Sequence, residues 1–90
     1  MKTSRDFILR EIAGEYILVP TGEAAVRLNG LIALNELGCF IFQTLQTEQT
    51  EQTLVDAIVA EYNVTREEAA ADAQAFVQQL AQDGVLAEDD

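Results

Sequence analysis

The sequence predicts an α+β domain in which a small antiparallel sheet of three strands is followed by three helices. Two short apolar runs separated by a glycine-containing turn come first, which is typical of a β-hairpin. From residue 35 onwards, apolar residues recur at helical spacing. A capping signal and a closing glycine then bracket a last helix over residues 65–84.

The predicted hairpin consists of strands over residues 7–13 and 16–19. Gly14-Glu15 lies between them, and a two-residue loop with glycine first suits a type II′ turn. Pro20 ends the second strand, because proline has no amide hydrogen for the ladder.

A third strand is predicted over residues 31–34. Asn29-Gly30, directly before it, is a strong turn signal. Residues 25–28 are therefore expected to be extended and to pair briefly with this strand.

The first helix begins after Asn35, a suitable N-cap residue. Apolar residues occupy both of its sides, so we expect it to be buried on both sides and to lie at the centre of the domain. One side carries Leu37, Phe40, Ile41 and Leu45, and the other carries Cys39 and Phe42.

Two further helices follow a polar linker over residues 44–53. The second covers residues 54–62. The third starts with Thr65 and Glu68, a capping box in which each side chain is expected to accept from the other residue's amide, and it ends at Gly84. Val85 and Leu86 are expected to return to the core.

Composition indicates one domain over residues 1–90, with the acidic tail 87–90 disordered. Hydrophobic residues make up 49% of the chain, enough for a core. The polar N-terminus has no apolar segment of a signal peptide, and a single cysteine allows no internal disulfide. We therefore expect a cytoplasmic domain.

Charge is distributed unevenly. The net charge is −11, yet residues 1–27 sum to zero, and residues 28–90 hold Arg66 against twelve acids. Such a surface repels nucleic acid and anionic membranes. It serves either as a solvated surface that maintains solubility or as a steering field for a basic partner.

Residues for catalysis are scarce. The chain has no histidine, no glycine-rich phosphate loop and no zinc-ligand spacing. Cys39 lies in the most apolar helix, where a core role is favoured over a nucleophilic one. We expect no enzymatic activity, no metal and no cofactor.

Binding is the remaining class of function. Residues 31–34 carry neither charge nor proline, the usual devices that prevent strand pairing at a sheet edge. Either this strand is central or covered, or its free edge accepts a partner peptide as an added strand.

Four motifs in order resemble the PqqD family, the D proteins of pyrroloquinoline quinone biosynthesis. The resemblance spans nearly the whole chain and rests on four segments: Leu9–Gly14, Val19–Glu23, Leu34–Gly38, and Asp72–Leu86 with Phe76, Val77, Leu80 and Gly84.

The resemblance implies a winged helix-turn-helix-like fold and a role as a recognition element for ribosomally made, modified peptides. Such a domain binds the leader of a precursor peptide beside its third strand and third helix, and presents it to a modifying enzyme, often a radical S-adenosylmethionine (SAM) enzyme. Carried over by position, the peptide-binding residues are Leu31, Ile32, Ala33, Leu34, Asn35, Asp72, Phe76 and Gln79.

Two points stay open at this stage. Phe76 is either a core residue or the apolar floor of the groove, and the groove lies either on the side of Asp72 and Gln79 or on that of Ala70, Val77 and Ala81. The segment Leu45–Glu48 lacks an Asp-Gly pair, and Ala73 stands where a valine is usual, so a peptide pathway other than the quinone pathway is favoured.

Two alternative functions differ in class. A winged-helix DNA-binding regulator needs a basic recognition helix, but here Arg66 stands alone among Glu67, Glu68 and Asp72. A protein-interaction adaptor without a leader ligand needs no special residues.

Overall fold

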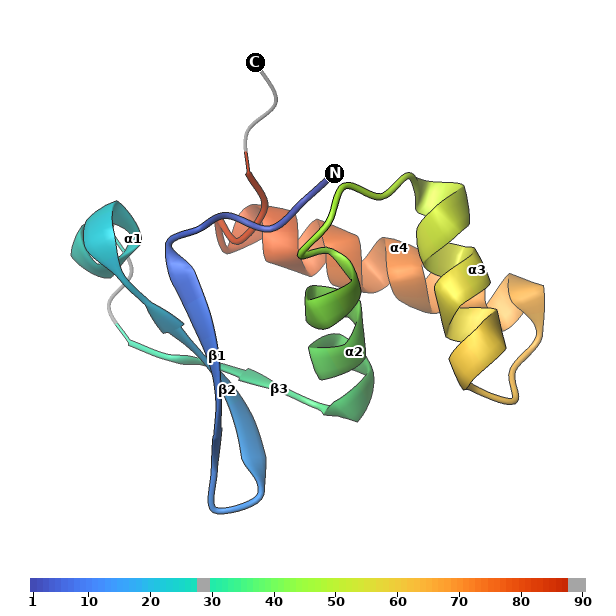
Figure 1. The fold of residues 1–90 in the computed structure, drawn as a ribbon, viewed down its shortest axis with the longest axis horizontal. Helices are drawn as coiled ribbons and strands as arrows, with labels where there is room; N and C mark the ends of the chain where they lie inside the picture. Colours follow the sequence, from blue (N-terminus) through green and yellow to red (C-terminus); the bar gives the residue numbers. More distant parts are fainter. Residues whose placement is uncertain (28–29, 88–90) are drawn as a thin grey trace.

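Residues 1–27 and 30–87, which the computed structural model describes, form a three-stranded antiparallel sheet and four helices (Figure 1). The predicted α+β class is confirmed. In chain order the elements are β1 (Phe7–Ile12), β2 (Glu15–Pro20), α1 (Gly22–Arg27), β3 (Ile32–Leu34), α2 (Glu36–Thr44), α3 (Glu51–Glu61) and α4 (Arg66–Gln82).

The strand order is β1-β2-β3, so β2 is central and β3 lies at an edge. Phe7 is opposite Pro20 and Ile12 is opposite Glu15 in the first ladder, while Leu18 is opposite Ile32 in the second. Of the two readings of the third strand, the edge position is the one found. The strand is one residue shorter than predicted, because Leu31 precedes it.

The hairpin turn lies one residue earlier than predicted. Ile12 and Glu15 already pair, so the loop is Ala13-Gly14 rather than Gly14-Glu15. Both loop residues have positive φ, 53° and 82°. Positive φ at both central positions is the type I′ geometry, which matches the twist of the flanking strands better than an unprimed turn. The type II′ assignment was therefore wrong.

Residues 25–27 are helical, so the prediction that residues 25–28 are extended was wrong for these three. Leu28 and Asn29 lie outside the described residues. Glu23 and Arg27 stand at the ends of α1 where their charges complement the helix dipole. Ala24 is 2% exposed and packs into the core, which a strand at this place would not achieve.

Helix α2 lies at the centre, as predicted. In Figure 1 it stands between the sheet and α3, with α4 running behind it. Ile41, Phe42 and Leu45 are buried, and they join Leu18 of the sheet and Leu80 of α4 in one apolar core. Burial of such side chains is the main stabilising term for a domain of this size.

The caps explain where the helices begin. The Asn35 side chain accepts from the Gly38 amide, as expected for the N-cap of α2. Helix α3 begins at Glu51, earlier than predicted, because Thr50 and Thr53 form a reciprocal capping box that shortens the linker.

The capping box of α4 is only half confirmed. The Thr65 hydroxyl accepts from the Glu68 amide, but it also donates to the Glu68 carboxylate, at 3.2 Å. At the other end of α4, Gly84 has φ 75°, and the Val85 amide donates to the Leu80 carbonyl. This is a Schellman motif, and it returns the buried Val85 to the core as expected.

Ala87 is exposed, and its amide donates to the Lys2 carbonyl at 2.8 Å. Glu88, Asp89 and Asp90 lie outside the described residues. The expectation for the tail 87–90 is therefore compared only at Ala87.

Candidate functional site

The free edge of β3 is the first component of the site. β2 pairs with one side of β3, and among the described residues no strand pairs with its other side. Ile32 and Leu34 are half-buried and pack against the core, whereas Ala33 is exposed and Leu31 is 60% exposed. A strand of this kind presents backbone donors and acceptors to which another chain can pair.

Phe76 of α4 packs against the first turn of α2, which directly follows this strand. A methyl group at position 38 would lie 2.6 Å from Cε1 of Phe76 and 3.3 Å from Oδ1 of Asn35. The ring of Phe76 and Oδ1 of Asn35 therefore both lie beside Gly38, and the absence of a side chain there leaves room for the ring. Phe76 is half-buried, so it both packs on the core and reaches the surface.

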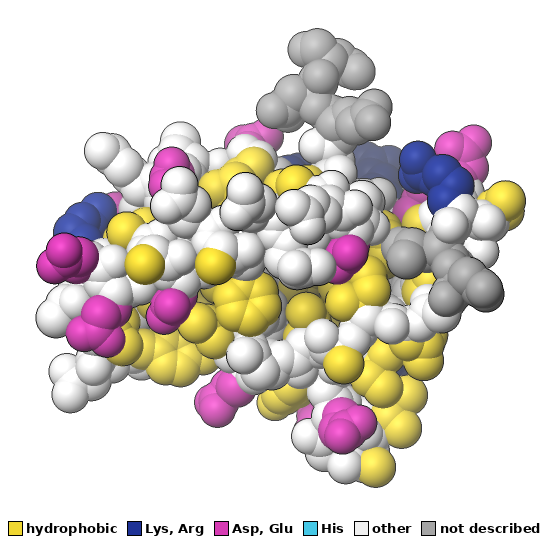
Figure 2. All heavy atoms as spheres, turned by 180° about the vertical axis from the view of Figure 1, so that it is seen from behind, with side chains coloured by type: hydrophobic (Ala, Val, Ile, Leu, Met, Phe, Trp, Pro, Cys, Tyr) yellow, Lys and Arg dark blue, Asp and Glu magenta, His cyan; other side chains and the backbone are white. Residues whose placement is uncertain are grey.

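Figure 2 shows the surface that results. In this view from behind, apolar side chains gather below α4, the helix that crosses the front of the molecule, and continue towards the hairpin. We call residues 31–35 together with Phe76 the β3–α4 surface. An apolar surface beside an unpaired strand edge offers both side-chain contacts and backbone hydrogen bonds to a peptide.

Asp72 and Gln79 lie on the same helix as Phe76 but are exposed. Gln79 donates to the Asp83 carboxylate at 3.1 Å. The structure therefore brings Phe76 and Asn35 together, while it leaves Asp72 and Gln79 as solvated flanks of α4.

The other side of α4 borders different surroundings. Val77 and Ala81 line a concavity of about 460 Å³ with Met1 and residues 49–51. Ala70 borders a smaller one beside the start of α3. Neither concavity includes a residue of β3, whereas Phe76 lies near Asn35, the residue that follows β3.

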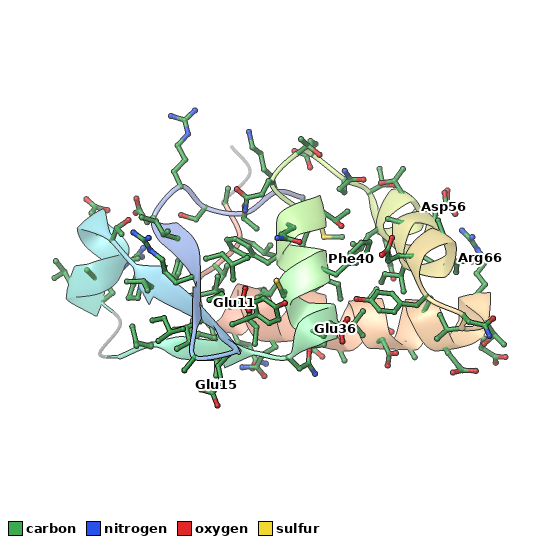
Figure 3. The ribbon with its side chains drawn as sticks, turned by 60° about the horizontal axis from the view of Figure 1, so that its bottom comes forward. Glu11, Glu15, Glu36, Phe40, Asp56 and Arg66 are labelled. Atoms are coloured by element: carbon green, nitrogen blue, oxygen red, sulfur yellow. The ribbon has the colours of Figure 1, made fainter. Side chains whose placement is uncertain are left out.

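A pocket of about 550 Å³ lies at the end of β3 and carries acidic groups. We call it the acidic pocket; its lining consists of Gly14, Glu15, Tyr16, Ala33, Leu34, Asn35 and Glu36. No residue of α4 lines it. Figure 3 shows Glu11, Glu15 and Glu36 around this end of the sheet.

The acidic groups around this pocket raise the pKa of Tyr16. Glu11 is opposite Tyr16 in the hairpin ladder. Repulsion from the Glu11 carboxylate is the largest cause that raises the pKa of Tyr16, and Cys39, burial and Glu36 add to it. The Tyr16 hydroxyl therefore remains a neutral hydrogen-bond donor at physiological pH.

Sequence reasoning did not find Tyr16 or Glu36. Tyr16 meets the third strand because it pairs with Leu34, and that register depends on the path of the chain through α1. Glu36 could have been found, because it directly follows Asn35, and an N-cap at Asn35 places it in the first turn of α2.

The described residues contain few groups for chemistry. Cys39 is 6% exposed, and burial, followed by the charges of Glu11 and Glu36, raises the pKa of its thiol, which disfavours the reactive thiolate. Within residues 1–27 and 30–87 no three potential ligands gather as a metal site would require. No helix of this part of the chain is long and apolar enough to cross a membrane.

Comparison with known proteins decides the family. The family model described as coenzyme PQQ synthesis protein D matches residues 15–86. The chain belongs to the PqqD family. Its recognition from four sequence motifs is thereby confirmed. No curated protein sequence matches this chain.

Two solved structures are similar to this PqqD-family protein. One is TbiB1 in complex with the TbiA(beta) leader peptide: it is 27% identical, with a TM-score of 0.77, over 100% of this chain and 99% of that one. The other is a lasso peptide synthetase B1 complexed with the leader peptide: it is 19% identical, with a TM-score of 0.72, over 93% of each chain. The second shows a shared fold.

Proposed function

We propose that this protein is a recognition element that binds the leader of a ribosomally made precursor peptide. The observation that carries the proposal is the free edge of β3 beside the half-buried Phe76. Similarity over its full length to TbiB1, which was solved with a leader peptide, supports the same kind of ligand here.

In the proposed complex the leader adds to β3 as a fourth strand. Its backbone pairs with residues 31–35, and alternate side chains turn towards Phe76 on one side and solvent on the other. Asp72 and Gln79 flank the bound segment from α4. Because Glu15 and Glu36 lie where the strand ends, this end favours a leader with a basic rather than an acidic residue.

We further propose that the protein is not itself a catalyst and that it presents the leader-bound precursor to a modifying enzyme in the cytoplasm. A radical SAM enzyme is the class that the family resemblance implies. The missing Asp-Gly pair after residue 45 and the alanine at position 73 favour a pathway other than that of the quinone.

A direct test is calorimetric titration with the leader of a precursor encoded beside this protein. We expect a dissociation constant in the micromolar range or below, with a negative heat-capacity change from apolar burial. The control is a scrambled peptide of the same composition, and equal binding of both peptides would contradict sequence recognition.

The charge distribution disfavours the DNA-binding alternative. Arg66, the one base of α4, pairs with Asp56 at 2.7 Å, and Glu67 and Glu68 stand beside it in the first turn. A recognition helix needs free bases that face phosphate.

A further inference from the structure

Four of the five basic side chains form no ion pair with a carboxylate of the described residues. Arg66 is the exception, through Asp56. The four, Lys2, Arg5, Arg10 and Arg27, belong to a chain with sixteen acidic residues. In so acidic a protein, bases that avoid local partners are available to an external anion.

Three of these four bases surround one cavity of about 530 Å³, which we call the basic cavity. Besides Lys2, Arg5 and Arg27, one acid, Glu23, borders it. Its complete lining is Lys2, Thr3, Ser4, Arg5, Glu23, Arg27, Ala81, Gly84, Leu86 and Ala87. Figure 2 shows blue side chains gathered on one side of the molecule and a single one at the opposite end, where Figure 3 labels Arg66.

The floor of the basic cavity is held by backbone hydrogen bonds between the two terminal segments. The Ser4 amide donates to the Val85 carbonyl at 2.7 Å, and the Ala87 amide donates to the Lys2 carbonyl at 2.8 Å. Thr3 is buried, and its hydroxyl accepts from the Gln46 side chain at 2.8 Å. The backbone that carries Lys2 and Arg5 is therefore held against the C-terminal segment.

We propose that the basic cavity binds an acidic peptide segment, rich in Asp or Glu side chains, on the enzyme that modifies the leader-bound precursor. The identity of that enzyme as the partner rests on the proposed function. A chain of net charge −11 repels an acidic surface, so such a surface approaches productively only where positive charge is concentrated.

An extended peptide suits the cavity better than a compact anion. The three bases of the cavity come from different places: Lys2 and Arg5 lie on the N-terminal segment, and Arg27 lies at the end of α1. The Glu23 carboxylate borders the same cavity. Glu23 repels any anion at this rim, but several carboxylates spaced along a chain can reach separate bases, whereas one phosphate holds its charge at a single place.

The cavity and the β3–α4 surface share no residue. The N-terminal segment leads into β1, at the sheet edge opposite β3. One partner can therefore occupy the cavity while a leader occupies the strand, which is the arrangement that presentation to an enzyme requires.

The first experiment is an NMR titration of the whole chain with a hexaglutamate peptide in about 20 mM salt, where screening is weak. We expect shifts of amides in residues 2–5, 27 and 84–87, with those of β3 unchanged. The triple variant Lys2→Gln, Arg5→Gln, Arg27→Gln should weaken binding at least about fivefold. Arg10→Gln, which removes a base outside the cavity that pairs with no carboxylate of the described residues, should leave hexaglutamate affinity within about twofold.

Three outcomes overturn the proposal. A loss of affinity in Arg10→Gln as large as that in Arg5→Gln, which removes one charge inside the cavity, would mean that only the net charge matters. Inorganic phosphate that moves the same amides with equal affinity would indicate a compact-anion site. Biolayer interferometry measures binding of the modifying enzyme encoded beside the protein. Its affinity should fall at least about fivefold for the triple variant but not for Arg10→Gln. Unchanged affinity of the enzyme for the triple variant would contradict the assigned partner.

A leader titration of the triple variant separates this proposal from the proposed function. Unchanged leader affinity together with lost hexaglutamate binding supports two independent sites. Absence of leader binding to the unaltered chain would count against the proposed function alone, because the hexaglutamate result does not depend on it.

Discussion

The acidic pocket beside β3 and the basic cavity between α1 and the two terminal segments differ in charge, and the fold explains the difference. At the β3 end, the acidic pocket is lined by Glu15 and Glu36 and no base. On the β1 side, the basic cavity gathers Lys2, Arg5 and Arg27. The acidic pocket adjoins the edge of β3 with which no described strand pairs. The basic cavity lies over the two terminal segments, whose backbones are hydrogen-bonded to each other.

This comparison shows that net charge alone describes the protein poorly. The sum of zero over residues 1–27 does not reveal that Lys2, Arg5 and Arg27 line one cavity while Glu15 lines another. A peptide and an enzyme could therefore approach different ends without competing. Titrations with leader and with hexaglutamate test whether the two regions behave as separate sites.

Phe76→Ala should raise the dissociation constant of the leader at least about tenfold, which corresponds to about 1.4 kcal/mol. The reason is loss of the apolar contact beside the β3 edge. Val77→Ala is the matched control, since Val77 is also half-buried on α4 but lines a different concavity. Calorimetry measures both, and a larger effect of Val77→Ala would assign the leader to the other side of the helix.

Gly38→Ala should destabilise the fold by about 1 kcal/mol net. Alanine in place of glycine in a helix gains about 0.5–1 kcal/mol, but overpacking against the Phe76 ring costs about 1–3 kcal/mol. Urea unfolding measures the difference. Adding Phe76→Leu should recover part of the loss, and stabilisation by Gly38→Ala alone would mean that the ring does not pack there.

Salt should separate the two ends. Raising ionic strength from about 50 to 200 mM should weaken hexaglutamate binding to the basic cavity several-fold, because exposed charges are screened. Leader binding should change less, since backbone hydrogen bonds and apolar contacts contribute most of it. Equal salt dependence in both titrations would argue against this division.

The smallest effect concerns Tyr16. Glu11→Gln should lower its pKa towards the ordinary value of about 10, because the Glu11 carboxylate is the largest cause of the rise. Glu36→Gln should lower it less. Tyrosine absorbance against pH measures the change in a Tyr62→Phe background, because the pKa of Tyr62 is also raised and also depends on Glu36. Glu15→Gln serves as the control, since Glu15 is not among the causes of the Tyr16 shift.

The raised pKa of Tyr16 also determines how the free energy of unfolding changes at alkaline pH. The folded state holds the Tyr16 proton more tightly than the unfolded chain does. Its contribution to stability is complete below about pH 10 and is lost as pH rises through the folded-state pKa. Glu11→Gln should reduce this alkaline loss.

The predictable parts of the fold were those with local causes. Asn35 as N-cap and Gly84 as helix terminator depend on neighbouring backbone groups, and both were predicted. Helix α1 was not predicted, because the turn signal at residues 29–30 favoured an extended segment before it. The burial of Ala24 in this helix depends on tertiary packing, which the local sequence does not report. The hairpin loop moved by one residue because the strand register, set across the sheet, placed Glu15 opposite Ile12.

The candidate site divides in the same way. The uncharged third strand was visible in the sequence, and Phe76 came from the family resemblance. The closeness of Phe76 to Gly38 and Asn35 brings together residues far apart in the chain, as does the gathering of Lys2 and Arg27 around one cavity. Such proximity follows from packing, which no local pattern reports.

Amide hydrogen exchange of residues 31–35 with and without leader tests the central claim most directly. In a strand, amides alternate between the two edges, so β3 has at least one that points away from β2 and exchanges freely in the unbound protein. Strand addition should protect that amide at saturating leader and leave the amides of α3 unchanged. A leader that binds fully while β3 exchanges as in the free protein would contradict the account.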